Sequence, residues 1–165
     1  MLRRRPGHRH PYPAGLAAGA FAVLALAGCG GGESGDDVYP PGVARPLDKV
    51  EFIAEADRIC HSTNARIEAA ADDLVAGPTD PTPAEVRRVV IGVAIPALEA
   101  EVRAIRAIGA PAGDEAKVAA ILAATEEGIE QIRADPAAVL EGPPPALREA
   151  GRLARAYGSA ECDVR

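Results

Sequence analysis

Histidine, the commonest side chain in transition-metal sites, is rare in this sequence. The 165 residues include three histidines, and His61 is the only one that follows residue 10. A di-iron bundle needs Glu-x-x-His motifs, but Arg58 stands three residues before His61. A haem attachment site needs C-x-x-C-H, and the pair Cys60-His61 lacks the first cysteine. Asp57 and His61 lie one helical turn apart, a spacing more typical of a surface ion pair than of a metal site. We therefore predict no metal and no cofactor.

Side chains that could act as nucleophiles or as acids are also poorly placed. The sequence has no G-x-S-x-G elbow and no P-loop. Ser62 is next to His61, but neighbours on a helix point about 100° apart and cannot act together. Paired carboxylates do acid–base work when they are buried, and charges are rarely buried unpaired. A solvated acidic face is therefore the favoured interpretation of three clustered glutamates, Glu126, Glu127 and Glu130. We predict no catalytic residue.

Charge and composition exclude nucleic acid as a partner. The net charge is −6 at pH 7, aromatic residues make up 3% of the chain, and tryptophan is absent. Such a chain offers neither a basic footprint nor an aromatic stacking platform. Three arginines recur along one face of the last expected helix, Arg148, Arg152 and Arg155. We expect them to bridge to acidic faces of neighbouring helices, and an acidic partner is the alternative.

The first thirty residues have the layout of an export signal. Four arginines precede an apolar run of 14 residues, 14–27, which is short for a membrane-spanning helix of about 20 residues. The run ends in Leu26-Ala27-Gly28-Cys29, which resembles the lipobox of bacterial lipoproteins. That resemblance implies removal of residues 1–28 and a diacylglyceryl group on Cys29, which anchors the chain on the extracytoplasmic side of the cell membrane. Two alternatives stay open, ordinary secretion after cleavage behind Ala27 and an uncleaved anchor.

The number of cysteines supports lipidation. Ordinary secretion would leave an odd thiol among Cys29, Cys60 and Cys162 in an oxidising compartment, whereas lipidation consumes Cys29 and leaves a pair. Removing the signal takes four of the 18 basic residues and no acid, so the mature chain has 14 basic and 24 acidic residues, a net charge of −10 over 137 residues. A surface of that charge is not drawn onto anionic lipid. The lipid on Cys29 is therefore the expected membrane contact.

Behind the signal, the pattern predicts a tether and one helical domain. Residues 29–46 are rich in glycine, proline and acid and are expected to be a flexible tether. Within residues 47–165, apolar residues spaced by three and four predict four helices and a short turn over 136–141. The four predicted helices cover residues 48–76, 82–108, 113–134 and 145–157. A D-x-x-E pair caps the first helix, and Pro96 should kink the second near Gly92. No stretch alternates between apolar and polar residues with a period of two, so no sheet is expected. The expected fold class is all-α.

The cysteine pair suggests how the helices are arranged. Short links between four helices favour an antiparallel up-down-up-down four-helix bundle. Cys60 lies 16 residues before Ala76, the expected end of the first helix, and Cys162 lies 17 residues after Pro145, the expected start of the last. At about 1.5 Å per residue, both offsets are about 24 to 26 Å. Antiparallel first and last helices would bring the sulfurs level, so we predict that one Cys60–Cys162 disulfide ties the bundle. Because a catalytic dithiol usually has C-x-x-C spacing, this bond is expected to be structural.

Three short segments of the mature chain resemble a loose set of small exported actinobacterial helical proteins with no assigned activity. The segments are Ala56-Asp57-Arg58-Ile59-Cys60, Pro111-Ala112-Gly113-Asp114, and Tyr157-Gly158 with Cys162. That resemblance implies a helical fold with paired cysteines and implies no chemistry.

These observations together predict a function in which the helical domain binds and does not catalyse. We expect a lipid-anchored binding or interaction module, held to the membrane through Cys29, whose partner is an envelope protein or a small-molecule ligand. The alternatives are an envelope enzyme with an unrecognised active site and a secreted helical protein without lipid. A deep pocket with converging polar groups would favour the enzyme, and a flat apolar groove between helices would favour the partner.

Overall fold

The computed structural model describes residues 45–163, and this part of the chain is all-helical, with no strand. The α-helices are α1 (Lys49–Val75), α2 (Pro83–Val89), α3 (Ile95–Ile108), α4 (Glu115–Ala134) and α5 (Pro145–Tyr157). The π-helix η1 (Val90–Ala94) joins α2 to α3, and the 3-10 helix η2 (Pro136–Glu141) lies between α4 and α5. The predicted all-α class is confirmed. The predicted signal peptide, the lipid site Cys29 and residues 30–44 of the predicted tether lie outside the described residues.

Helix α1 begins at the capping box that the sequence predicts. The Asp48 carboxylate accepts a hydrogen bond from the backbone N of Glu51 (2.9 Å), and the Glu51 carboxylate accepts one from the backbone N of Asp48 (3.0 Å). Each bond satisfies a backbone donor that the first turn of a helix leaves without a partner. From this start α1 buries one stripe of side chains, Phe52, Ala56, Cys60 and Thr63.

The predicted kink of the second helix takes the form of a π-helical turn. Pro96 has no backbone N–H, so the carbonyl of Gly92 receives no helical hydrogen bond from it. The ladder changes at this place, because the backbone N of Ile95 donates to the carbonyl of Val90, five residues earlier. Two helices, α2 and α3, therefore stand where the sequence predicts one helix with a bend.

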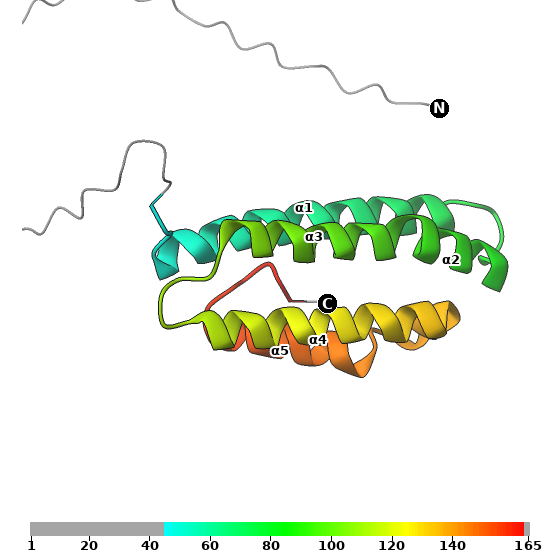
Figure 1. Cartoon of the computed structure of the whole chain (residues 1–165). Coiled ribbons are helices and arrows are strands. Elements are labelled where there is room, and N and C mark those ends of the chain that lie inside the picture. Colours follow the sequence, from blue (N-terminus) through cyan, green and yellow to red (C-terminus); the bar gives the residue numbers. More distant parts are fainter. Residues whose placement is uncertain (1–44, 164–165) are drawn as a thin grey trace, which may run out of the picture. The chain divides into compact units, whose positions relative to one another are not determined.

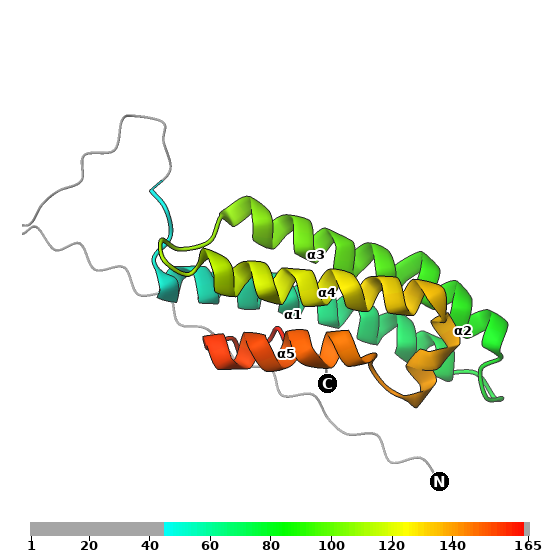
Figure 2. The same ribbon diagram turned by 60° about the horizontal axis from the view of Figure 1, so that its bottom comes forward.

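The helices of the described part lie in two layers, shown in Figure 1. Helices α1, α2 and α3 form one layer, and α4 and α5 form the other. Turning the view brings α5 forward beside α4 (Figure 2). The closest backbone packing is between α4 and α5, followed by α1 with α3 and α3 with α4. Most of the buried core side chains come from α1, α3 and α4, where the two layers face each other.

Glycine permits the close approach of α4 and α5. Gly128 is buried in α4, and a Cβ atom built on it would lie 2.5 Å from the Leu147 side chain and 3.0 Å from the Leu147 backbone N. Any larger residue at this position would force the two helices apart. Among the described residues, no helix is both long enough and apolar enough to cross a membrane.

Candidate functional site

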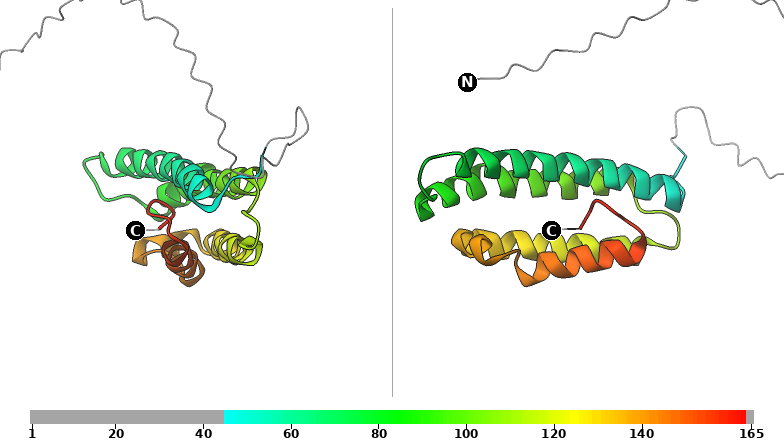
Figure 3. Two further views of the ribbon diagram at one scale, coloured as in Figure 1. Left: turned by 90° about the vertical axis from the view of Figure 1, so that its left-hand side faces the viewer. Right: turned by 180° about the vertical axis from the view of Figure 1, so that it is seen from behind.

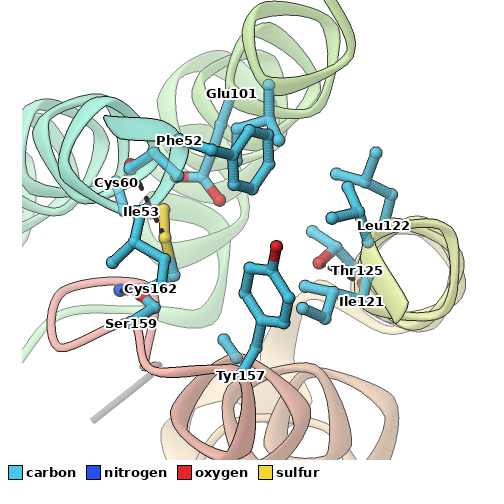
Figure 4. A pocket seen from close by; sticks show the side chains of 14 residues that line it. Phe52, Ile53, Cys60, Glu101, Ile121, Leu122, Thr125, Tyr157, Ser159 and Cys162 are labelled. Carbon is cyan, nitrogen blue, oxygen red and sulfur yellow. Dashed lines mark hydrogen bonds between the residues drawn. A yellow bond between two sulfur atoms is a disulfide. The ribbon is translucent and has the colours of Figure 1, made fainter. Parts of the chain in front are cut away.

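A small cavity lies between the two layers, and Figure 4 shows the side chains around it. Its volume is about 40 Å³, which has room for buried water but not for an organic ligand. Its lining is mostly apolar and comes from α1, α3, α4, α5 and the segment that follows α5. Among the lining residues, Glu101 and Tyr157 carry titratable groups, and Cys60 and Cys162 form a disulfide.

Glu101 brings a carboxyl group to this cavity from α3. Burial raises the pKa of Glu101, and the hydroxyl of Thr63 offsets part of that rise. A carboxyl that takes up a proton more readily than usual is a common feature of general acids. Glu101 was not among the predicted site residues, although its spacing of three and four from the buried residues Leu98 and Ile105 places it on the buried stripe of α3.

Tyr157 closes the cavity from the end of α5. Its hydroxyl donates a hydrogen bond to Asp114 Oδ2 at 3.0 Å. Burial, together with this carboxylate, raises the pKa of Tyr157 to about 12. The ring packs edge-on against Phe52, with centroids 6.1 Å apart, and the Lys49 ammonium lies 4.4 Å from its centroid. Tyr157 is therefore a protonated packing residue near neutral pH, unsuited to act as a base.

The segment after α5, residues 158–163, is called the tail from here on. Gly158 ends α5 in the left-handed conformation, with φ at 118°, and the tail then runs back toward α1, as Figure 3 shows. On α1, Asp57 accepts hydrogen bonds from three successive tail residues, Ser159, Ala160 and Glu161. The bond from Ser159 comes from its hydroxyl, and the other two come from backbone N–H groups. One carboxylate thus holds half of the tail.

A covalent bond fastens the same tail to the same helix. Cys60 on α1 and Cys162 in the tail form the predicted disulfide, with their Cα atoms 5.0 Å apart. A helical rise of about 1.5 Å per residue does not apply as far as Cys162, because α5 ends at Tyr157 and the tail covers the remaining distance. Helix α1 has little close backbone contact with α5, so the tail makes the link.

His61 and Asp57 do not form the surface ion pair that their spacing predicts. The carboxylate of Asp57 is taken up by the tail, and Nδ1 of His61 lies 3.4 Å from the carboxylate of Glu161. Both side chains of that contact are exposed. Within residues 45–163, no three histidine, cysteine, aspartate or glutamate side chains are grouped so that they could hold a metal ion.

No family model matches the chain, and no curated protein or solved structure compared with it does so either. The site is therefore interpreted from its own residues. All three segments used for the resemblance to small exported proteins contribute to it. The first supplies Asp57 and Cys60, the second supplies Asp114, and the third supplies Tyr157 and the tail.

Serine side chains do not form a nucleophilic site here. Ser62 is exposed on α1, and Ser159 donates its hydroxyl proton to Asp57 while its oxygen accepts a hydrogen bond from the backbone N of Cys162 (3.1 Å). A hydroxyl that both donates and accepts in this way serves to hold the tail backbone on α1. Ser34 lies outside the described residues.

The glutamates of α4 lie on an exposed face, as the favoured interpretation has it. Their partners are polar groups on the surface: Glu126 pairs with Arg106 of α3 at 2.8 Å, Glu130 pairs with Arg133, and Glu127 accepts from Gln131 at 3.2 Å. Exposed pairs of this kind contribute little to stability. An open groove of about 240 Å³ runs beside the Arg106–Glu126 pair, between α3 and α4.

The arginines of α5 do not bridge to neighbouring helices, so that expectation is wrong. Their side chains are exposed and find local partners instead. Arg152 pairs with Glu149 of its own helix at 2.6 Å. Arg155 pairs with Asp163 of the tail, and Arg148 donates to the carbonyl of Pro143.

Proposed function

We propose that the chain is a bacterial lipoprotein whose helical domain works as a binding or interaction module on the extracytoplasmic side of the cell membrane. The motif Leu26-Ala27-Gly28-Cys29 supports the lipid anchor, because it follows a basic segment and ends an apolar run. Cys29 receives a diacylglyceryl group and becomes the first residue of the mature protein. Two acyl chains hold a protein to a bilayer stably, whereas one chain holds it only marginally.

Several contacts in the domain support a binding role in preference to catalysis. Side chains of catalytic type at the cavity and beside it hold the fold together: Asp57 of α1 binds Ser159 of the tail, and Tyr157 binds Asp114. The cavity itself has a volume of about 40 Å³, which is too small for a substrate. Glu101 is the feature that favours the alternative of an envelope enzyme, because its pKa is raised.

We also propose that the described helices form an up-down-up-down four-helix bundle, in which α2, η1 and α3 make one bent rod. The start of α1 meets the end of α5 through the ring contact of Phe52 and Tyr157. The second half of α4 meets the start of α5 through Gly128 and Leu147. Both contacts support antiparallel neighbours. Nuclear Overhauser effects between these two pairs test the arrangement, and their absence in a folded sample would contradict it.

The intact mass of the protein purified from membranes tests the anchor. The proposal predicts a chain that begins at Cys29 and carries lipid. A lipid-free chain that begins at Gly28 would show ordinary secretion instead, and a chain of full length would show an uncleaved anchor. The variant Cys29→Ala should lose the lipid mass, and Ser34→Ala, five residues further on, is the matched control that should keep it.

The binding role is tested with the domain at a membrane. The mature protein, cross-linked in intact cells and purified, should bring down the same envelope protein in independent preparations, and excess free domain, residues 47–165, should compete for it. A partner that free domain cannot displace would contradict binding by this domain. Turnover of an envelope substrate that is lost in Glu101→Gln but kept in Glu68→Gln would favour the enzyme.

A further inference from the structure

The two cysteines of the disulfide sit in unequal surroundings. Cys60 is 1% exposed and belongs to the middle of α1, where it faces the core. Cys162 is half-buried in the tail, beside the cavity and in contact with the edge of the core. A thiol reacts only when a reagent can reach it, so these two sulfurs differ in access while the helices are folded.

The tail also has a means of reaching α1 that does not depend on the disulfide. Asp57 accepts bonds from Ser159, Ala160 and Glu161, and Asn64 Nδ2 donates to the carbonyl of Glu161 at 2.9 Å. Asp57 precedes Cys60 by three residues, and Ser159 precedes Cys162 by three. Since Asp57 and Ser159 are bonded to each other, the two cysteines that follow them are brought side by side.

We propose that this disulfide is made in a fixed order, with Cys162 as the entry sulfur for a disulfide-bearing thiol oxidoreductase and Asp57 as the residue that positions the closing step. In the first step the Cys162 thiolate attacks the disulfide of the oxidoreductase. A mixed disulfide forms, and one thiolate of the oxidoreductase leaves.

In the second step the tail docks on Asp57, which places the mixed disulfide beside Cys60. The Cys60 thiolate attacks the Cys162 sulfur, and the second thiolate of the oxidoreductase leaves. The two cysteines have then lost two electrons to the oxidoreductase, whose disulfide is reduced to a dithiol, and the protons of both cysteine thiols have gone to solvent or to the leaving thiolates. The reverse order would require the partner to reach the buried Cys60 first.

In this scheme Asp57 holds the tail on α1. It thereby raises the effective concentration of the Cys162 mixed disulfide at the Cys60 thiolate. Without its bonds the tail is a short segment behind the end of α5 that keeps the Asn64 hydrogen bond to α1, so Cys162 spends less time beside Cys60. Losing Asp57 should therefore slow the closing step and leave the entry step unaffected. Loss of a residue that served stability alone would not slow the closing step while leaving the rate of the entry step unchanged.

Oxidation of the reduced full chain by oxidised glutathione tests the order. The chain carries Cys29→Ala, so that Cys60 and Cys162 are its two thiols, and acid quenching at early times is followed by peptide mapping. The mixed disulfide with glutathione should be found on Cys162. Glutathione found mainly on Cys60, or equally on both, would overturn the proposal. In urea, where neither thiol is buried, the preference should disappear.

The variant Asp57→Ala tests the closing step in the same chain. The mixed disulfide on Cys162 should form at an unchanged rate and accumulate on the order of tenfold more, because closure is slower. The matched control is Asp73→Ala, an exposed carboxylate on the same helix, which should behave like the parent chain. Circular dichroism of each reduced variant checks that the helices are present. Equal accumulation in Asp57→Ala and Asp73→Ala would remove Asp57 from the scheme, and loss of helicity in Asp57→Ala alone would show that it serves the fold and not the closing step.

Discussion

Helix α5 and the tail are consecutive in the sequence, but they are joined to the rest of the domain by different means. Helix α5 lies against α4 through apolar contact, with Leu147 packed on the bare backbone of Gly128. The tail is held on α1 by hydrogen bonds to Asp57 and by the disulfide. Apolar packing is distributed over many atoms, whereas the tail depends on a few side chains of α1, chiefly Asp57, Cys60 and Asn64. The contact of the tail should therefore be the easier one to break by a single substitution.

Loss of the disulfide should have the largest effect. We expect Cys162→Ser to lower the free energy of unfolding by about 2 to 5 kcal/mol, because the bond closes a loop of about 100 residues and restricts the unfolded chain. Urea denaturation of the oxidised parent and the variant measures the difference, and the reduced parent chain is the control that should match the variant. A loss of less than about 1 kcal/mol would mean that the helix faces hold the domain without help from the tail.

The second-largest loss of stability is expected at Gly128, where α4 and α5 are in close contact. Gly128→Ala places a Cβ atom against Leu147, including its backbone N, and should lower the free energy of unfolding by about 1 to 3 kcal/mol. The matched control is Gly92→Ala in η1, where a Cβ atom meets nothing within 4 Å. That variant should be neutral or more stable by up to about 1 kcal/mol, because alanine is the better helix former. Equal effects at the two positions would show that α4 and α5 are not in close contact.

The hydrogen bonds of the tail should contribute a similar or smaller amount. Asp57→Ala removes the acceptor of three donors, and a hydrogen bond to a charged group contributes about 1.5 to 3 kcal/mol when it is lost alone. We expect a total loss of about 1 to 3 kcal/mol, because the exposed backbone N–H of Ala160 can be hydrated instead, whereas the hydroxyl of Ser159 is buried. Asp73→Ala serves as the control for removing one negative charge from α1. In the Cys162→Ser background the loss should persist, because the tail docks on Asp57 without the disulfide.

These contacts differ in how far the sequence could predict them. Helix bounds follow from apolar spacing and from caps such as Asp48 with Glu51, because those signals are local. The disulfide followed from the number of cysteines, although the offset argument assumed a continuous helix to Cys162. The bond of Asp57 with Ser159 joins residues 102 positions apart, and no local pattern reports such a partner. Helical spacing therefore predicts the nearer His61 as the partner of Asp57. In the structure the Asp57 carboxylate binds the tail instead.

The smallest effect is expected at the boundary of the two layers, where Glu101 faces the cavity. Burial raises the pKa of Glu101 above its ordinary value of 4.5. The folded state then binds this proton more tightly than the unfolded state does, so the stabilising contribution is present below the ordinary carboxyl pKa and is lost as the pH rises through the raised one. Glu101→Gln keeps the side-chain shape and has no charge to bury.

This variant should therefore match the parent chain in acid and be more stable than the parent at pH 7. Urea denaturation across this pH range, with Glu68→Gln on the exposed face of α1 as the control, measures the difference. A variant less stable than the parent at pH 7 would mean that the hydroxyl of Thr63 stabilises the Glu101 carboxylate by more than burial destabilises it. A variant more stable by the same amount at every pH would mean that the carboxyl does not titrate differently on folding, and the gain would come from packing alone.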